Sequence, residues 1–323
     1  MRGAMRTATV AVAAFAAGCA TPPARPPAIG CIDIDARHGR LLPAALCPAR
    51  IYGIGLSYAG HAGETGARTD AEAQPPIFKK SPGSLNAEGL PVRVPSMPLL
   101  VEALDQLEPG LGREAARRIK DLPALLDYEA ELAFVLLEEV DWRRIEEPSY
   151  APRIGFFVAN DLSARSVAAL GEGRPDRDDY WGASKSFPGF LPVGPWIWVP
   201  DAPTLDAVPC VTLTAEVNGE VRQRETTARL LYTPRQMLRG IAARFPDDLP
   251  GAGDLVLTGT PEGVALRVPK WKRTLADLLG IDRFARLSLL IGMAGRSGRF
   301  LTPGDLVIVS GGPLGSTSVT IAP

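Results

Sequence analysis

Two glutamates stand two residues apart inside an apolar run near the middle of the chain. In LDYEAELAFVLLEE, residues 126–139, Glu129 and Glu131 come just before a series of aliphatic and aromatic side chains. Residues i and i+2 of a β-strand project from the same face, so these carboxylates would lie side by side. Two like charges about 4 Å apart repel by roughly 4 kcal/mol at an effective dielectric constant near 20. A buried pair must therefore share a proton, find cations or bind a metal ion.

A third carboxylate follows a second apolar segment. Asp161 ends the run IGFFVAND, in which residues 154–159 are apolar. Three carboxylates with no cysteine or histidine nearby suit a hard divalent ion such as Mg²⁺, Mn²⁺ or Ca²⁺ better than Zn²⁺. Spacing alone leaves two interpretations open. These acids either form a buried metal site or face solvent as part of an ordinary polar alternation.

The elements that must position these acids are mostly strands. The chain has 323 residues, of which 33 are glycine and 31 proline, and this supply of turn residues favours a strand-rich fold over a helical bundle. Runs rich in β-branched and aromatic residues lie between Gly, Pro or Asp, among them IYGI, RIGFFVAN, WIWVP, VPCVTLTAEV, DLVLTGT and DLVIVS. Asn218-Gly219 is typical of a two-residue hairpin turn. We therefore expect hairpins and a rolled or barrel-like sheet.

Two segments predict helical insertions. Residues 98–126 should form two helical halves that break at Pro109-Gly110. Residues 270–291, KWKRTLADLLGIDRFARLSLLI, combine apolar faces with interspersed basic side chains. Helices of this kind pack on the body of the protein or on a second subunit, and a surface lying on anionic lipid is the alternative.

The first residues are typical of an export signal. Arg2 and Arg6 precede an apolar stretch, residues 7–17, that is too short to span a bilayer, and the segment ends in AAGC. It resembles a bacterial lipoprotein signal, although Ala16 stands where leucine is usual. We expect residues 1–18 to be a signal peptide and Cys19 to be the first mature residue, with a lipid that anchors the chain to a membrane. The alternatives are a plain secretory signal, or a mis-assigned start and a cytoplasmic protein.

Composition and cysteine positions set further expectations. A formal net charge of −1 provides no basic stripe, so nucleic acid is not expected as a partner. Residues 19–50 should form a proline-rich tether and N-terminal extension, and residues 51–323 the catalytic domain, in the cell envelope. Cys31 and Cys47 could pair in an oxidising compartment, although their spacing alone does not show it. Cys210, in an apolar run, is predicted to be a buried thiol.

Taken in order, the motifs resemble the fumarylacetoacetate hydrolase family. From about Ile51 to the end, the chain reads YGIGLSYAGHAGETG, FKKSPGSL, EAE, NDLSAR, GASKSFPGFLPVGPW, VNGEVRQ, LTGTPEGV and PGDLVIV. The resemblance implies an α+β, strand-rich fold, a mixed β-roll with helical insertions, and a homodimer. It also implies that Glu129, Glu131 and Asp161 hold Mg²⁺, or Mn²⁺ or Ca²⁺, and that the substrate is a small dicarbonyl or 2-oxo acid.

The resemblance also implies roles for individual side chains. His61 and Glu64 match a dyad in which a carboxylate-bound imidazole can deprotonate a water molecule near neutral pH. Lys185 matches a lysine that reaches the substrate oxygen and would stabilise developing negative charge. Three further residues match substrate-binding positions, although the neighbouring Lys79 leaves the register of the last one open: Arg165, Thr260 and Lys80.

Some positions depart from the family pattern. Ser166 and Ala168 stand where an acid and a glutamine are common, and Ser57 stands where asparagine is usual.

From the resemblance as a whole we expect a metal-dependent hydrolase that cleaves a C–C bond in an acylpyruvate-like or fumarylacetoacetate-like β-dicarbonyl. One alternative is a decarboxylase of an oxaloacetate-like 2-oxo acid, or an isomerase, on the same fold. The other is a non-catalytic lipoprotein of the envelope that binds a small ligand.

Overall fold

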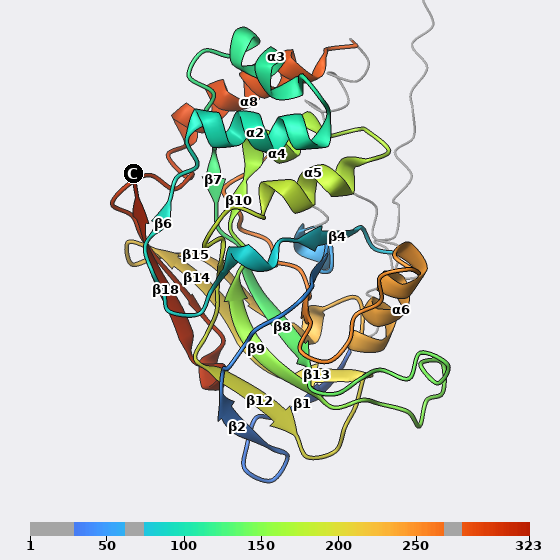
Figure 1. Cartoon of the computed structure of the whole chain (residues 1–323). Helices are drawn as coiled ribbons and strands as arrows, with labels where there is room; N and C mark the ends of the chain where they lie inside the picture. Colours follow the sequence, from blue (N-terminus) through green and yellow to red (C-terminus); the bar gives the residue numbers. More distant parts are fainter. Residues whose placement is uncertain (1–28, 62–73, 268–279) are drawn as a thin grey trace, which may run out of the picture.

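The strand that contains Glu131 and the strand that ends just before Asp161 lie at the centre of a seven-stranded sheet. The computed structural model describes residues 29–61, 74–267 and 280–323 (Figure 1). β8 (Ala130–Leu136) and β9 (Ile154–Asn160) are antiparallel neighbours in the strand order β2-β12-β9-β8-β16-β3-β4, and all their residues are buried. The flanking strands are β2 (Gly39–Pro43), β3 (Ile51–Ile54), β4 (Ile77–Lys80), β12 (Trp196–Pro200) and β16 (Leu255–Leu257).

A five-stranded sheet packs against this first sheet. Its order is β15-β14-β17-β18-β6, and β14 contacts β8 while β17 and β18 contact β9. Its strands are β6 (Val92–Arg93), β14 (Thr212–Val217), β15 (Glu220–Thr226), β17 (Leu306–Ser310) and β18 (Ser316–Ala322). Asn218 and Gly219 join β14 to β15 with φ values of 53° and 83°, as a type I′ hairpin turn requires. The hairpin predicted from this dipeptide is confirmed.

The alternation of side chains along β8 separates two hydrophobic cores. Ala130, Leu132, Phe134 and Leu136 join the main core, whereas Ala133 and Val135 join a smaller one with residues of β3, β9 and β16. Glu131 has the parity of the second set and therefore faces the smaller core. In the register of β8 with β9, Glu131 lies opposite Ala159. The sheet thus directs its acids to one face.

Most of the helices gather at one end of the two sheets (Figure 1). They are α2 (Met97–Leu107), α3 (Leu111–Arg118), α4 (Arg165–Leu170), α5 (Arg177–Ser184) and α8 (Arg283–Ser297), while α6 (Pro234–Arg244) lies at the side of the seven-stranded sheet. Gly110, with φ of 89°, separates α2 from α3, so the predicted break at Pro109-Gly110 is confirmed. Glu108 accepts two hydrogen bonds from Arg283, at 2.9 and 3.0 Å, which ties α2 to α8.

The second predicted insertion is partly described. Residues 270–279 lie outside the described part of the chain. α8 begins after Asp282, whose carboxylate accepts hydrogen bonds from Phe284 N and Ala285 N, and it continues past Ile291 to Ser297. The strand-rich α+β architecture with helical additions that the sequence predicts is confirmed.

Short pairs of strands complete the fold. They are β1 (Gly30–Ile32) with β13 (Ala207–Pro209), β5 (Leu85–Asn86) with β11 (Leu191–Pro192), and β7 (Leu126–Asp127) with β10 (Ser163–Ala164). Within the described ranges, 3₁₀ turns lie at Pro82–Ser84, Thr227–Arg229 and Gly312–Leu314. Residues 29–50 therefore contribute β1 and β2 to the folded body. The predicted domain boundaries stay a prediction.

The cysteine expectations are wrong. Cys31 forms a disulfide with Cys210, 179 residues away, and Cys47 is free and exposed. The reason is the parallel pairing of β1 with β13, in which Cys31 lies opposite Val208 and the Cα atoms of the two bonded cysteines are 5.1 Å apart. Cys210 is accordingly neither a thiol nor fully buried.

The predicted signal peptide, residues 1–18, and Cys19 lie outside the described residues. Among the residues that are described, no helix has both the length and the hydrophobicity needed to cross a bilayer.

Candidate metal centre

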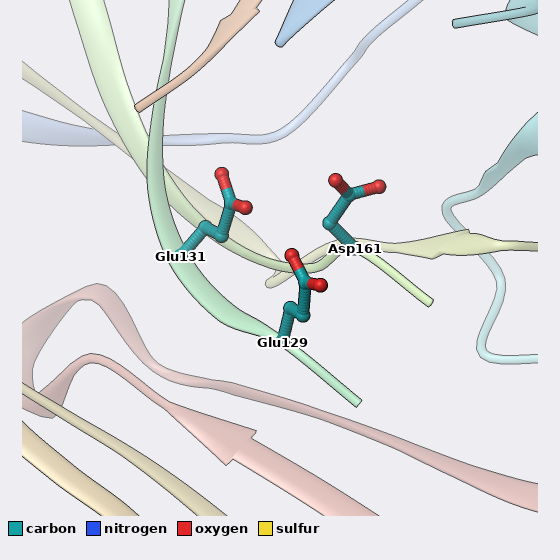
Figure 2. Close-up of side chains that lie close together, drawn as sticks. All are labelled: Glu129, Glu131 and Asp161. Atoms are coloured by element: carbon teal, nitrogen blue, oxygen red, sulfur yellow. The ribbon is translucent and has the colours of Figure 1, made fainter. Parts of the chain in front are cut away.

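Three buried carboxylates converge at the ends of β8 and β9. Each offers an oxygen within 4.8 Å of the other two, and Figure 2 shows the three groups projecting to the same side of the strands. Glu129, Glu131 and Asp161, called here the acidic triad, are 5%, 2% and 0% exposed. The backbone N–H of Asp161 donates to the Glu129 carbonyl at 2.9 Å, which continues the antiparallel register beyond β9. The interpretation of these acids as solvent-facing is therefore wrong.

Two lysines neutralise part of the triad. Lys185 Nζ lies 2.7 Å from Glu129 Oε2 and 2.6 Å from Asp161 Oδ2, so it bridges two of the three acids. Lys80 Nζ donates to Asp161 Oδ1 at 2.5 Å and to the Phe190 carbonyl at 2.8 Å. Both ammonium groups are buried. Lys185, which directly follows α5, thus pairs with the triad, and its partners are Glu129 and Asp161 rather than the acids of α5, Asp178 and Asp179.

The position of Lys80 in β4 resolves the ambiguity with its neighbour. Lys79 points away from the triad, pairs with Asp248, and lies 4.3 Å from the centre of the Phe245 ring. Alternation along β4 explains this difference, because adjacent residues of a strand project to opposite faces. Lys80 is the lysine that reaches the acids.

Arg165 is directed at two carboxylates. Its Nε donates to Asp127 Oδ2 at 2.8 Å, and its Nη2 pairs with Glu129. Asp127, fully buried, also accepts hydrogen bonds from Ala265 N at 2.7 Å and Leu266 N at 3.2 Å. Arg165 therefore orients Glu129 in this structure, and Asp127 joins β7 to the loop that follows β16.

Glu131 is the acid with the least positive charge around it. The four buried carboxylates Asp127, Glu129, Glu131 and Asp161 face three cations, and among the described contacts the hydrogen-bond donor to Glu131 is Gly259 N at 2.8 Å. Burial, and then the charge of Asp161, raises the pKa of Glu131 well above its ordinary value. Burial also acts to raise the pKa of Glu129, but Lys185 and then Arg165 outweigh it and lower that pKa to about 2.

The pKa values of Lys80 and Lys185 also differ because of the balance between burial and neighbouring charges. Burial lowers the pKa of Lys80, because one carboxylate, Asp161, does not compensate fully for desolvation. Burial acts in the same direction on Lys185, but Asp161 and Glu129 together raise its pKa. Lys185 therefore stays charged more firmly than Lys80.

His61 lies beside the triad, and its predicted partner is not described. The imidazole is buried and close enough to Glu129 for its charge to contribute to the low pKa of that carboxyl group. Glu64 lies in residues 62–73, outside the described residues. Thr260 is buried, and its hydroxyl donates to the Ala130 carbonyl at 3.1 Å.

Three site residues were missed as individual positions in the sequence. Asp127 precedes Glu129 by two residues, a spacing that could have extended the acidic pattern. Asn160 Oδ1 accepts a hydrogen bond from Glu129 N at 3.1 Å, and Gln223 Oε1 accepts one from Ala130 N at 2.9 Å. Both stand inside motifs that the sequence analysis quoted, NDLSAR and VNGEVRQ. Their contacts depend on tertiary packing.

The donor set fits a hard divalent cation. All three ligand groups are carboxylates, they are mutually close, and among the described ion pairs the three cations contact Asp127, Glu129 and Asp161 rather than Glu131. Oxygen ligands of this kind suit Mg²⁺, Mn²⁺ or Ca²⁺, and a dication would offset the repulsion among the acids.

Comparisons with known proteins agree with this geometry. The sequence profile of the fumarylacetoacetate (FAA) hydrolase C-terminal family matches residues 50–322. The chain is 31% identical over 225 residues to protein Rv2993c of Mycobacterium tuberculosis, which covers 70% of this chain and 69% of that protein. It is 25% identical over 242 residues to oxaloacetate tautomerase YisK of Bacillus subtilis, covering 74% of this chain and 68% of that protein.

A solved structure shows the same fold. The fumarylpyruvate hydrolase of Pseudomonas aeruginosa in complex with Mn²⁺ and pyruvate superposes with a TM-score of 0.52 at 19% identity, covering 94% of this chain and 98% of that one.

Proposed function

The chain belongs to the fumarylacetoacetate hydrolase family, and from that premise we propose that it is a divalent-metal-dependent hydrolase of a carbon–carbon bond in a small acylpyruvate-like or fumarylacetoacetate-like β-dicarbonyl acid. The observation that carries the proposal is the buried acidic triad with the lysines that contact it. A surface-binding protein has no need to bury three carboxylates, because each must be desolvated and then compensated. This burial argues against the alternative of a non-catalytic lipoprotein.

Each residue near the triad has a chemical task in this proposal. An Mg²⁺ or Mn²⁺ ion held by Glu129, Glu131 and Asp161 would supply Lewis-acid polarisation of the substrate oxygens. Lys185, held at the triad with a raised pKa, provides a fixed positive charge for the enolate that develops when the C–C bond breaks. Lys80 adds a second cation on the other oxygen of Asp161.

His61 is the proposed general base. Its imidazole would take a proton from the attacking water, and Glu64 would hold the imidazole in the required tautomer. The burial of His61 and its proximity to Glu129 support this role. We expect His61→Ala to abolish turnover while Mn²⁺ binding persists, and Glu129→Gln to weaken Mn²⁺ binding itself. Wild-type rates in His61→Ala across a panel of diketo acids would show that the water-activation role is wrong.

Tautomerisation of an oxaloacetate-like 2-oxo acid is the second candidate. It requires an enolate and a proton donor but no attacking water. Two observations favour it: Ala168 stands where a glutamine is common in the family, and one relative is an oxaloacetate tautomerase. Decarboxylation of oxaloacetate would use the same enolate.

One experiment separates these reactions. A single Mn²⁺-loaded preparation is given acetylpyruvate and oxaloacetate in parallel, and hydrolysis, keto–enol conversion and CO₂ release are followed spectroscopically. Hydrolysis of acetylpyruvate with Lys185-dependent rates supports the proposal. Fast keto–enol conversion of oxaloacetate without acetylpyruvate cleavage assigns the second candidate instead.

We also propose that the chain is exported, lipid-anchored at Cys19 and dimeric. The N-terminal sequence supports export, and the Cys31–Cys210 disulfide supports an oxidising compartment. Mass spectrometry of the mature N-terminus and light scattering of the purified protein test these points. An unprocessed Met1 would contradict the signal peptide, and a monomer in solution would contradict the dimer.

A further inference from the structure

One buried glutamine crosses from the second sheet to the strand of the acidic triad. Gln223 lies on β15 opposite Ala215, and it is 1% exposed. Its Oε1 accepts a hydrogen bond from Ala130 N at 2.9 Å, and its Nε2 donates to Thr260 Oγ1 and to the Pro261 carbonyl, both at 2.9 Å. The amide therefore uses its acceptor and its donors entirely within the protein.

These contacts satisfy backbone groups of β8 beyond the point where its neighbour β16 ends. β16 pairs with β8 from Leu255 opposite Val135 to Leu257 opposite Ala133, and it stops before Ala130. The N–H and C=O of Ala130 face this edge, where the described strands supply no backbone partner. A buried backbone group without a partner costs about 1–3 kcal/mol. Gln223 accepts a hydrogen bond from the Ala130 N–H, and the Thr260 hydroxyl donates one to the Ala130 C=O at 3.1 Å.

The contacts form a closed ring around the residue between two ligands. Ala130 N–H binds Gln223, Gln223 binds Thr260, and Thr260 binds the Ala130 carbonyl. Glu129 and Glu131 leave the backbone on either side of Ala130. A rotation of either peptide plane would turn a carboxylate away from the triad and break a hydrogen bond of the ring.

We propose that Gln223 is a positioning residue that fixes the direction of Glu129 and Glu131 toward the ion and holds the Thr260 hydroxyl in place. This inference rests on the metal site of the proposed function. The described hydrogen bonds of the Gln223 amide go to Ala130, Thr260 and Pro261, so it acts on Glu129 and Glu131 through the backbone between them. Partners that orient metal ligands from outside the coordination sphere typically contribute 10–100-fold to metal affinity or activity.

A metal titration distinguishes positioning from a general contribution to folding. Mn²⁺ is titrated calorimetrically into wild type, Gln223→Ala and the isosteric Gln223→Glu, and the unfolding temperature of each is measured in EDTA. Gln223→Ala should raise the Mn²⁺ dissociation constant about 10–100-fold. Gln223→Glu keeps the acceptor for Ala130 N and loses a donor, so its dissociation constant should lie between those of wild type and Gln223→Ala.

The matched control is Thr227→Val in the turn after β15. Thr227 is also fully buried, and its Oγ1 accepts a hydrogen bond from Val211 N at 3.0 Å and donates to the Pro209 carbonyl at 2.5 Å. The Thr227→Val variant should unfold at a lower temperature than wild type but bind Mn²⁺ with the same affinity.

The outcomes are distinct. A Gln223→Ala protein with a lowered unfolding temperature and an Mn²⁺ dissociation constant within about twofold of wild type overturns the positioning role. If the alanine variant does not fold, the Mn²⁺ dissociation constant of Gln223→Glu is judged by the same criterion. If wild type itself takes up no Mn²⁺, the metal site of the proposed function fails, and the positioning role fails with it.

Discussion

Replacing Lys185 by methionine tests the electrostatic basis of the site. Its ammonium group lies 2.7 Å from Glu129 and 2.6 Å from Asp161, and all three side chains are buried. Methionine keeps much of the aliphatic volume and removes the charge. The two acids would then face each other with Lys80 and Arg165 as the remaining cations.

The expected loss of stability follows from the pKa of Glu129. Burial acts to raise this pKa, but Lys185, followed by Arg165, lowers it from 4.5 to about 2. At 1.36 kcal/mol per unit, this shift corresponds to about 3 kcal/mol of stability, present above pH 4.5 and lost as the pH falls through the folded-state value. Removal of one partner from a buried ion pair costs about 3–5 kcal/mol. Arg165 shares this shift, but Lys185 also pairs with Asp161, so Lys185→Met should lower the free energy of unfolding by roughly 3 kcal/mol at pH 7.

Urea denaturation in EDTA and in excess Mn²⁺ measures this loss. Mn²⁺ should recover about half of it or more, because a dication at the triad supplies the missing charge. Lys79→Met is the matched control, since Lys79 is 39% exposed and pairs with the exposed Asp248, a contact worth less than about 1 kcal/mol. The reasoning is refuted if Lys185→Met is as stable as wild type in EDTA, or if Mn²⁺ restores nothing.

Three further predictions concern charge, a loop and the disulfide. In EDTA, the raised pKa of Glu131 contributes stability that is fully present below about pH 4.5 and is lost as the pH rises through the pKa of Glu131 in the folded state. Urea denaturation from about pH 5 to 9 should show this decline in the free energy of unfolding. The Glu131→Gln variant should show a flatter pH dependence. Arg235 donates to the Ile145 carbonyl at 2.8 Å and to Asp206 at 2.9 Å. Arg235→Ala should therefore lower the free energy of unfolding, measured by urea denaturation, by about 3 kcal/mol, and calorimetry should show an unchanged Mn²⁺ affinity. Cys31→Ser should cost about 2–5 kcal/mol, and dithiothreitol should lower the unfolding temperature of wild type but not of this variant.

Much of the fold follows from local sequence. Strand segments, the Asn218-Gly219 turn and the break at Pro109-Gly110 were predicted because each depends on φ/ψ preferences and side-chain alternation over a few neighbouring residues. The parity of Glu129 and Glu131 is equally local, since two residues along a strand return a side chain to the same face. The family resemblance, rather than spacing, supplied the roles assigned to His61 and Lys185.

The sequence by itself determined which residues carry charge, where strands and turns form, and that two acids share a face. Only the tertiary structure decided which partners those acids meet. Asp161 joins Glu129 through the register of β8 with β9, and Lys80 rather than Lys79 reaches them through the pleat of β4. Gln223 arrives from another sheet, and Cys31 finds Cys210 across 179 residues. These contacts depend on the relative placement of distant elements, which the burial of the whole core fixes and no short stretch of sequence contains.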